Sequence, residues 1–210
     1  NGLAISQGND LWQTFEYFSG YGFNKSHAVS YSIISYQCAW LCNYYTTEWT
    51  ASFLDKEPET RKEKAINLAK QHGYIIQPLN INKSHRSWEI LDEQTLIAPL
   101  TTIKGLGDKA IDQILAHRPF NTVEELLFNE NIIYSKLNKK ALDALCRAGA
   151  MKDLQDDRFT GDKHFWTATC VDRPRKLKNF AENIEKYRPE GNFSDDERID
   201  FLANLTGIFP

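Results

Sequence analysis

What the sequence holds little of excludes several classes of protein. Its four cysteines, at positions 38, 42, 146 and 170, form no Cys-x-x-Cys pair and are too sparse for a secreted disulfide scaffold. Reduced thiols in a cytoplasmic protein are therefore expected. Cys38 and Cys42 could share a helical face, but no histidine or third cysteine lies near them in the sequence. We therefore expect no metal or other cofactor to be bound by this chain.

Long apolar runs are missing too. No stretch approaches the roughly 20 apolar residues of a membrane span, and the N-terminus lacks the basic-then-apolar pattern of a signal peptide, so no membrane contact is expected. The five histidines are scattered and no carboxylates cluster among them, which argues against a metal-dependent nuclease. The chain begins at Asn1 instead of Met, which suits a piece of a longer protein.

The sequence does contain enough apolar material for a folded protein. Of its 210 residues, 41% are hydrophobic and 12% aromatic, which allows one large core or two small ones. The formal net charge is −3. This total does not exclude nucleic-acid binding, because such binding depends on where the cations lie.

The spacing of apolar residues predicts a long buried or half-buried helix from Ser26 to about Phe53, a stretch without Gly or Pro. Ser26 is predicted to cap this helix after a turn at residues 20–22. A second helix is predicted over residues 57–72, with Glu57 paired to Arg61 and Gly73 as its stop. The residues expected to face inward are Val29, Ile33, Tyr36, Trp40 and Tyr44 in the first helix and Ala65, Leu68 and Ala69 in the second.

The rest of the chain alternates between two patterns. Short β-like stretches at 74–76, 87–91 and 95–98 predict a small β element or extended crossing. Capping residues and closing Pro, Asn or Gly predict helices over 108–117, 122–128 and 138–148, and a further helix over 194–205. The predicted fold is mainly α, divided at 1–77 (helical), 78–100 (β or extended), 101–153 (compact helical module) and 154–210 (an extension with a basic stretch at 173–178 and no assigned role).

Residues 20–27, Gly-Tyr-Gly-Phe-Asn-Lys-Ser-His, form the first segment with recognisable chemistry. Free amides at a helix N-terminus, beside a lysine and a hydroxyl, are a natural receptor for phosphate oxygens. Lys25 is the only cation among residues 1–55. The segment does not have the spacing of a Walker A loop. The alternative is an ordinary glycine turn with a solvated Lys25.

A second segment, residues 103–111, has a Gly-x-Gly turn that leads into a helix, and residues 136–150 look like its degenerate partner. This arrangement resembles the helix-hairpin-helix family, which points hairpin amides and lysines at the duplex backbone. Residues 101–152 contain eight Lys or Arg and six Asp or Glu, in a chain that is acidic overall. The alternative is that these cations only solvate a helical bundle.

Residues 155–159, Gln-Asp-Asp-Arg-Phe, are a weak likeness to the short peptides with which polymerases bind a sliding clamp. Arg158 stands where such peptides usually have an apolar residue. An ordinary loop is therefore expected here, with the clamp as a possible partner.

Taken together, residues 18–28, 31–37, 103–107, 136–139 and 148–150 closely resemble the bacterial DNA polymerase III alpha subunit, the C-family replicase. The resemblance covers about residues 10–153 and does not clearly include the tail. It implies that residues 1–77 belong to the fingers, which meet the incoming dNTP, and that residues 101–153 hold primer–template DNA. The implied nucleotide-binding residues are Asn24, Lys25, Ser26 and His27, and the implied DNA-binding residues are Lys104, Gly105, Leu106, Gly107, Lys109, Lys139 and Lys140.

The resemblance also implies a partner. In this family, palm carboxylates that hold two magnesium ions precede the fingers, and this sequence holds no such palm. The chain is therefore expected to need the palm-containing remainder of the polymerase and to be inactive alone. The rival hypothesis is a non-catalytic helix-hairpin-helix module that binds DNA without contacting a triphosphate.

Overall fold

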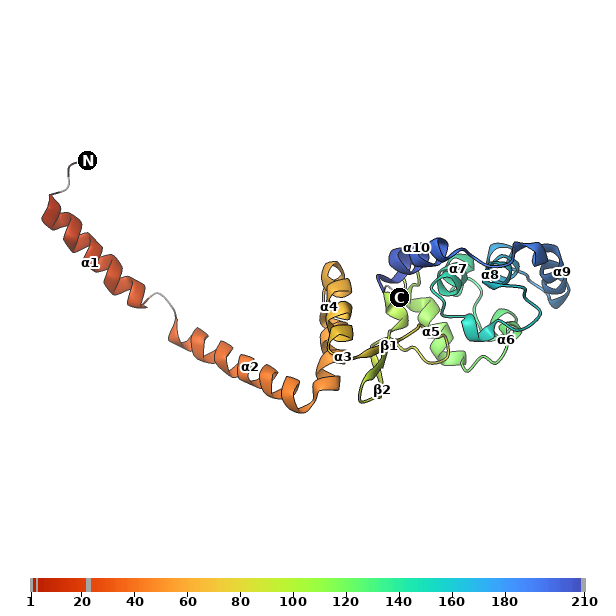
Figure 1. The fold of residues 1–210 in the computed structure, drawn as a ribbon, viewed down its shortest axis with the longest axis horizontal. Coiled ribbons are helices and arrows are strands. Elements are labelled where there is room, and N and C mark those ends of the chain that lie inside the picture. Colours follow the sequence, from red (N-terminus) through yellow and green to blue (C-terminus); the bar gives the residue numbers. More distant parts are fainter. Residues whose placement is uncertain (1, 3, 22–23, 209–210) are drawn as a thin grey trace. The chain divides into compact units, whose positions relative to one another are not determined.

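The computed structural model describes residues 2, 4–21 and 24–208 (Figure 1). The chain divides into two compact units between Trp49 and Thr50, and each is described by itself. The boundaries predicted near residues 77, 100 and 153 stay predictions. No helix in the described part of the chain combines the length and the apolar composition needed to cross a bilayer.

The first unit contains α1 (Ile5–Tyr21) and α2 (Lys25–Tyr44). The predicted helix start near Ser26 is confirmed, but the cap is Asn24, whose side chain accepts a hydrogen bond from Ser26 N at 3.0 Å. Of the predicted turn at 20–22, residues 20 and 21 are the last two residues of α1, and residue 22 lies outside the described residues. The predicted single helix to Phe53 is wrong, because α2 ends at Tyr44 and a new helix begins at Thr46.

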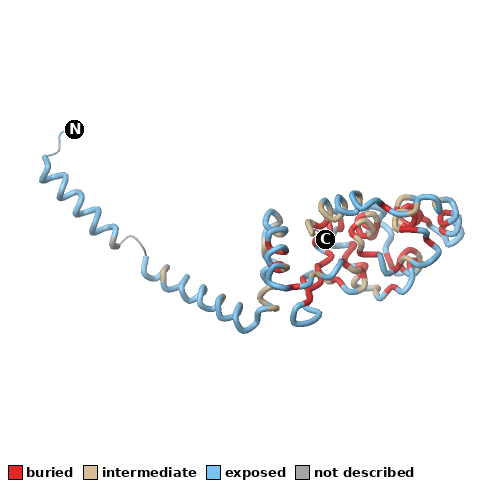
Figure 2. The backbone as a smooth tube through the Cα atoms, viewed as in Figure 1, coloured by how far each residue is buried: buried red, intermediate tan, exposed pale blue. Residues whose placement is uncertain are grey.

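The predicted burial of α2 is also wrong. No residue of α2 is buried, and the side chains of Val29, Ile33 and Tyr36 are 50%, 53% and 71% exposed (Figure 2). Trp40 and Tyr44 are likewise exposed. Helical spacing of apolar residues indicates an apolar face, but it does not reveal whether the same chain covers that face. Within the described residues, nothing buries it.

Helix α3 (Thr46–Lys56) leads into the second unit, where Ala51 and Leu54 are buried. Helix α4 (Glu59–Gln71) confirms the second predicted helix. Its buried residues are Ala65, Ile66 and Ala69, whereas Leu68, predicted to face inward, is 46% exposed. The predicted Glu57–Arg61 ion pair is present at 2.7 Å. Gly73 ends this segment with φ +90°, a conformation that side chains with a Cβ atom rarely adopt.

A small sheet follows, which confirms the predicted β element. Its strands are β1 (Ile75–Gln77), β2 (Glu89–Asp92) and β3 (Thr95–Ile97), in the order β1-β3-β2. The central strand β3 pairs parallel to β1 and antiparallel to β2, so that Leu96 lies opposite both Ile76 and Ile90. All three residues of β3 are buried, because the strand lies between its neighbours and against the helices.

The predicted helical module is confirmed as α5 (Asp108–His117), α6 (Val123–Leu127) and α7 (Lys139–Arg147). The residues after 153 form α8 (Asp162–Trp166), a π-helical turn (Thr167–Val171), α9 (Leu177–Tyr187) and α10 (Asp195–Thr206). Only the last of these elements is predicted from the sequence. Short 3₁₀ turns occupy Leu100–Thr102, Lys152–Leu154 and Arg188–Glu190.

One hydrophobic core joins this extension to the helical module. Phe165 and Phe180 from the extension belong to the same buried cluster as Leu142 and Leu145 of α7. In Figure 1, α7 and α8 lie beside one another, and their residues are in contact. The module and the extension are therefore one structural body.

Candidate nucleic-acid interface

Two short hairpins introduce α5 and α7, and we call residues 103–107 the first hairpin and residues 134–138 the second hairpin. Each places one leucine in the core, Leu106 at 7% and Leu137 at 0% exposure. Each ends at a residue with extended backbone, Gly107 or Asn138, which caps the following helix. The sequence pattern of a hairpin and its degenerate partner thus corresponds to a repeated structure.

Local hydrogen bonds explain why both segments turn. In the first hairpin, Leu106 N donates to Ile103 O at 3.1 Å, and Gly105 has φ +90°. In the second hairpin, Leu137 N donates to Ile133 O at 3.1 Å, and the Asn138 side chain accepts from Ala141 N at 3.0 Å. Asn138 therefore supplies the helix cap where the first hairpin has a glycine.

The amides of the first hairpin are not all available to a ligand. Lys104 N donates to Leu205 O, next to the end of α10, at 2.8 Å. By contrast, Gly105 N and Gly107 N have no acceptor within the described residues, and both glycines are exposed. Two amides rather than the whole turn can therefore be offered to a phosphate oxygen.

The first hairpin lies beside the start of α7, the helix that follows the second hairpin. A Cβ atom at Gly105 would lie 3.5 Å from Lys140 Cε, which is ordinary van der Waals contact. The predicted DNA-binding lysines are all exposed, two of them beside each hairpin: Lys104, Lys109, Lys139 and Lys140. The structure thus brings every predicted DNA-binding residue to one region of the second unit.

Acidic side chains near the first hairpin are already paired. Arg86 Nη1 donates to Asp108 Oδ1 at 2.8 Å, and the same guanidinium binds Asp112. These hydrogen bonds, above all the one that Arg86 donates to Asp112, raise the pKa of Arg86 above its ordinary value. Arg86 therefore offsets the carboxylate charge in the first turns of α5, where it would otherwise repel a phosphate.

The predicted nucleotide-binding residues lie in the other unit, at the start of α2. Asn24, Lys25, Ser26 and His27 are all exposed. Ser26 Oγ donates to Asn24 Oδ1 at 2.6 Å, so the cap and the hydroxyl engage each other. The His27 ring lies 4.3 Å from the Tyr31 ring. Residues 22–23 of the same motif lie outside the described residues.

Sequence reasoning assigns no role to residues 173–178, which we call the basic segment, yet the structure places them against the second hairpin. Arg173 Nη1 donates to Leu137 O, and the Arg173 guanidinium carbon lies 3.8 Å above the Tyr134 ring. Four cations within six residues are the available sequence signal. Their proximity to a hairpin far away in the chain is visible only in the fold.

The segment at 155–159 is an ordinary loop, as expected. Phe159 is buried, with its ring 4.9 Å from the Phe165 ring in an edge-to-face arrangement. Arg158 pairs with Asp156 and Glu124, and its hydrogen bonds to them raise its pKa above the ordinary value. The aromatic side chain that a clamp-binding peptide would project is therefore part of the core.

Comparison with known proteins agrees with this geometry. Residues 73–160 match the family model of the helix-hairpin-helix motif. The chain is similar to a Pseudomonas aeruginosa protein named DNA polymerase III subunit alpha, with 27% identity over 98% of this chain and 18% of the relative. Relatives of the same name from Xylella fastidiosa (strain Temecula1) and Thermus aquaticus are each 32% identical, over 75% and 74% of this chain.

The chain spans only a small part of these relatives, 18% of the first and 14% and 13% of the other two. The match to the Pseudomonas aeruginosa protein covers 98% of this chain and so includes residues of the tail. The sequence-based view that the tail does not clearly match the family is therefore corrected.

Proposed function

Because this chain corresponds to a segment of the DNA polymerase III alpha subunit family, we propose that its two hairpins bind the sugar–phosphate backbone of primer–template DNA within a replicative DNA-directed DNA polymerase. One observation carries this proposal: the exposed Lys140 side chain, in the first turn of the helix that follows the second hairpin, lies beside the exposed Gly105 of the first hairpin. Hairpin amides and lysines recognise phosphates irrespective of base sequence. Binding without sequence preference is what a replicase needs from the part that holds its duplex.

Salt dependence tests this proposal directly. For the full chain, the logarithm of the affinity for a short duplex should fall linearly with the logarithm of the salt concentration, with a slope on the order of −5, because each neutralised phosphate releases counterions. Fluorescence anisotropy with labelled duplexes of unrelated sequence measures this slope. A slope near zero, or strong preference for one duplex sequence, would contradict backbone binding by the hairpins.

The finer part of the proposal concerns the first unit, which we assign to the fingers. Lys25 is supported as a triphosphate contact by its exposed position in the first turn of α2 and by the lack of any other cation among residues 1–55. A lysine beside helix N-terminal amides attracts an anion both by its charge and by the direction of the helix dipole.

Replacement of Lys25 by alanine should raise the dNTP requirement of a reconstituted polymerase. With a palm-containing partner present, we expect the KM for dNTP to rise about 10- to 100-fold, the size expected when one charge-assisted hydrogen bond is lost. Primer extension at varied dNTP concentration measures this change, with Lys64→Ala as the control. An unchanged KM alongside intact duplex binding would leave the chain as a DNA-binding module alone.

The same proposal assigns the chemical step and the remaining contacts. Magnesium held by palm carboxylates elsewhere in the polymerase supplies nucleotidyl transfer, and this chain's residues supply binding. The exposed apolar side chains of α1 and α2, among them Trp12, Phe15 and Ile33, pack against that remainder, since apolar patches of this kind mark contact surfaces. The proposed polymerase acts in the cytoplasm. A sliding clamp is not part of the proposal, because Phe159 is buried.

A further inference from the structure

The basic segment is fixed to the second hairpin by an arginine that is itself largely withdrawn from solvent. Arg173 stacks on Tyr134 and donates to Leu137 O, and Pro174 beside it is buried. Burial lowers the pKa of Arg173 from its ordinary value, and the nearby Tyr134 and Cys170 act against this shift. Arg173 Nε is buried without a hydrogen-bond partner among the described residues. Arg173 is therefore the anchor of the segment and not its outward-facing charge.

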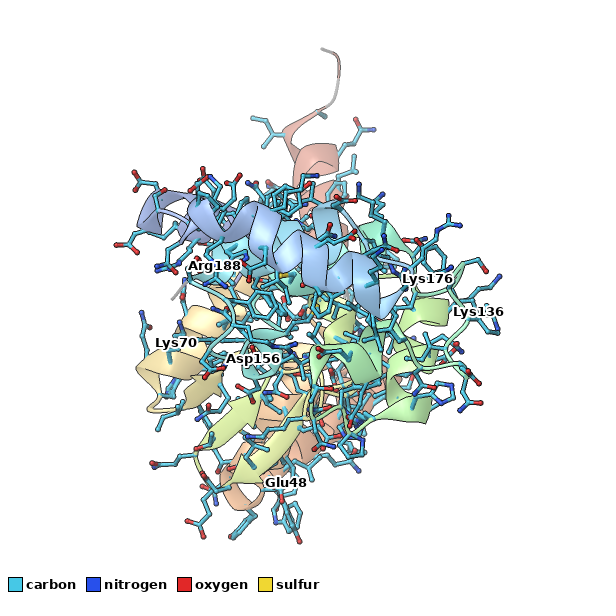
Figure 3. All side chains as sticks on the ribbon, turned by 90° about the vertical axis from the view of Figure 1, so that its right-hand side faces the viewer. Glu48, Lys70, Lys136, Asp156, Lys176 and Arg188 are labelled. Carbon is cyan, nitrogen blue, oxygen red and sulfur yellow. The ribbon has the colours of Figure 1, made fainter. Side chains whose placement is uncertain are left out.

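The residues that follow the anchor face solvent. Arg175, Lys176 and Lys178 are exposed, and the Arg175 guanidinium carbon lies 5.6 Å from the centre of the Tyr134 ring. Figure 3 shows Lys176 and Lys136 pointing outward on the same side of the molecule. The basic segment thus continues the exposed surface of the second hairpin.

This combined surface is strongly positive. Residues 133–142 and 173–181 contain seven Lys or Arg and no Asp or Glu, in a chain whose net charge is −3. The flanking carboxylates are engaged elsewhere: Asp143 binds Arg147 and Trp166, and Asp172 binds Lys186 and the Tyr187 hydroxyl. Among the described residues, Lys178 is the one cation of this surface with a carboxylate oxygen within 4.0 Å, that of Glu182. The flanking carboxylates therefore offset little of the positive charge on this surface.

Cations gathered in this way repel one another unless a polyanion covers them. Duplex DNA carries about one charge per 1.7 Å of its axis, so a backbone that meets the second hairpin has further phosphates within reach of adjacent cations. We propose that the basic segment extends the duplex-binding surface beyond the hairpins, with Arg175, Lys176 and Lys178 contacting the DNA backbone and Arg173 and Tyr134 as positioning residues. This inference rests on the duplex binding proposed for the hairpins.

A matched pair of variants tests the extension in the full chain. The variant R175A/K176A/K178A should bind a short duplex about 100-fold more weakly at about 0.1 M salt, with a log–log salt slope shallower by about 2 to 3, since three phosphate contacts are lost. The control R61A/K62A/K64A removes the same residue types from α4. It also breaks an ion pair, as the test variant does, because Arg61 pairs with Glu57 and Lys178 with Glu182. The control should keep both the affinity and the slope.

Tyr134 provides a second variant, which leaves all three proposed contact residues in the sequence. Tyr134→Ala removes the ring beneath both guanidinium groups, whereas Tyr134→Phe keeps it. We expect the alanine variant to lose about 10-fold in affinity and the phenylalanine variant to bind like the unaltered chain. Both variants keep the net charge, so a difference between them reports on positioning of the segment. Equal affinity of the two would overturn the positioning role.

The outcomes separate this inference from the function on which it rests. One variant replaces Lys104, Lys109, Lys139 and Lys140 by alanine, and we call it the hairpin variant. If the hairpin variant abolishes binding but R175A/K176A/K178A matches its control, the role of the basic segment is wrong and the hairpin function stands. If R175A/K176A/K178A weakens binding and the hairpin variant does not, the basic segment binds DNA and the hairpin function fails. If the unaltered chain binds no duplex, or if neither variant weakens binding, both ideas are overturned.

Discussion

Replacing Lys104, Lys109, Lys139 and Lys140 together by alanine should weaken duplex binding on the order of 1,000-fold at about 0.1 M salt, and should make the log–log salt slope shallower by about 3 to 4. All four side chains are exposed beside the two hairpins. Each is expected to displace one condensed counterion from the DNA backbone, so their losses add. Residual binding is expected from the basic segment and from the free amides of Gly105 and Gly107.

Two comparisons make this result decisive. Replacing the same lysines by arginine keeps the charge and should keep the salt slope, because backbone contacts depend on charge more than on the shape of the cation. The variant K56A/K62A/K64A/K70A on α3 and α4 removes as many lysines from elsewhere in the second unit and should bind normally. If the two alanine variants lose affinity equally, general electrostatic attraction and not the hairpins accounts for binding. Circular dichroism of each variant establishes that it is folded.

Phe165→Ala should cost about 3 to 5 kcal/mol of folding free energy, the usual loss when a large aromatic side chain is removed from a core. Phe165 is 2% exposed and meets the Phe159 ring edge-to-face at 4.9 Å. Urea denaturation measures the change. Leu177→Ala, at a side chain that is 62% exposed, should change stability by less than about 0.5 kcal/mol.

The location of this loss is as informative as its size. Phe165 belongs to the extension, yet its buried cluster includes Leu142 and Leu145 of α7. Hydrogen exchange of the α7 amides should therefore accelerate in Phe165→Ala, because a shared core opens as one cooperative unit. Unchanged protection of α7 would mean that the extension folds separately, against the single core described here.

The sequence predicts those elements whose ends carry a local signal. The Asn138 side chain caps α7 by a hydrogen bond to a backbone amide of that helix, and Gly73 adopts a positive φ. Both residues therefore mark helix boundaries that can be recognised without tertiary information. The caps Gly161 and Lys176, by contrast, make no side-chain capping bond. Neither α8 nor α9 is predicted, whereas α5, which also lacks such a bond, is predicted from the Gly-x-Gly turn before it. At α2, Asn24 and Ser26 are both good capping residues, and spacing alone does not choose between them.

Burial and the extent of the candidate site depend on contacts that a single pattern does not contain. The apolar spacing of α2 predicts an apolar face, but the described residues leave that face exposed. The hairpin lysines follow from the Gly-x-Gly pattern at Gly105 and Gly107, whereas the basic segment joins the site through Arg173 and Tyr134, which are distant in sequence. Such contacts between residues distant in sequence depend on how the whole core packs, which no single local pattern specifies.

Residues of the extension form hydrogen bonds with both hairpins. Its last helix accepts the Lys104 amide hydrogen at Leu205 O, and Arg173 holds the carbonyl of Leu137. These contacts within the chain therefore fix the distance between the two hairpins without any ligand. Under the proposed function, a turn that binds one phosphate would present the other turn to its own phosphate at a high effective concentration and without an ordering penalty.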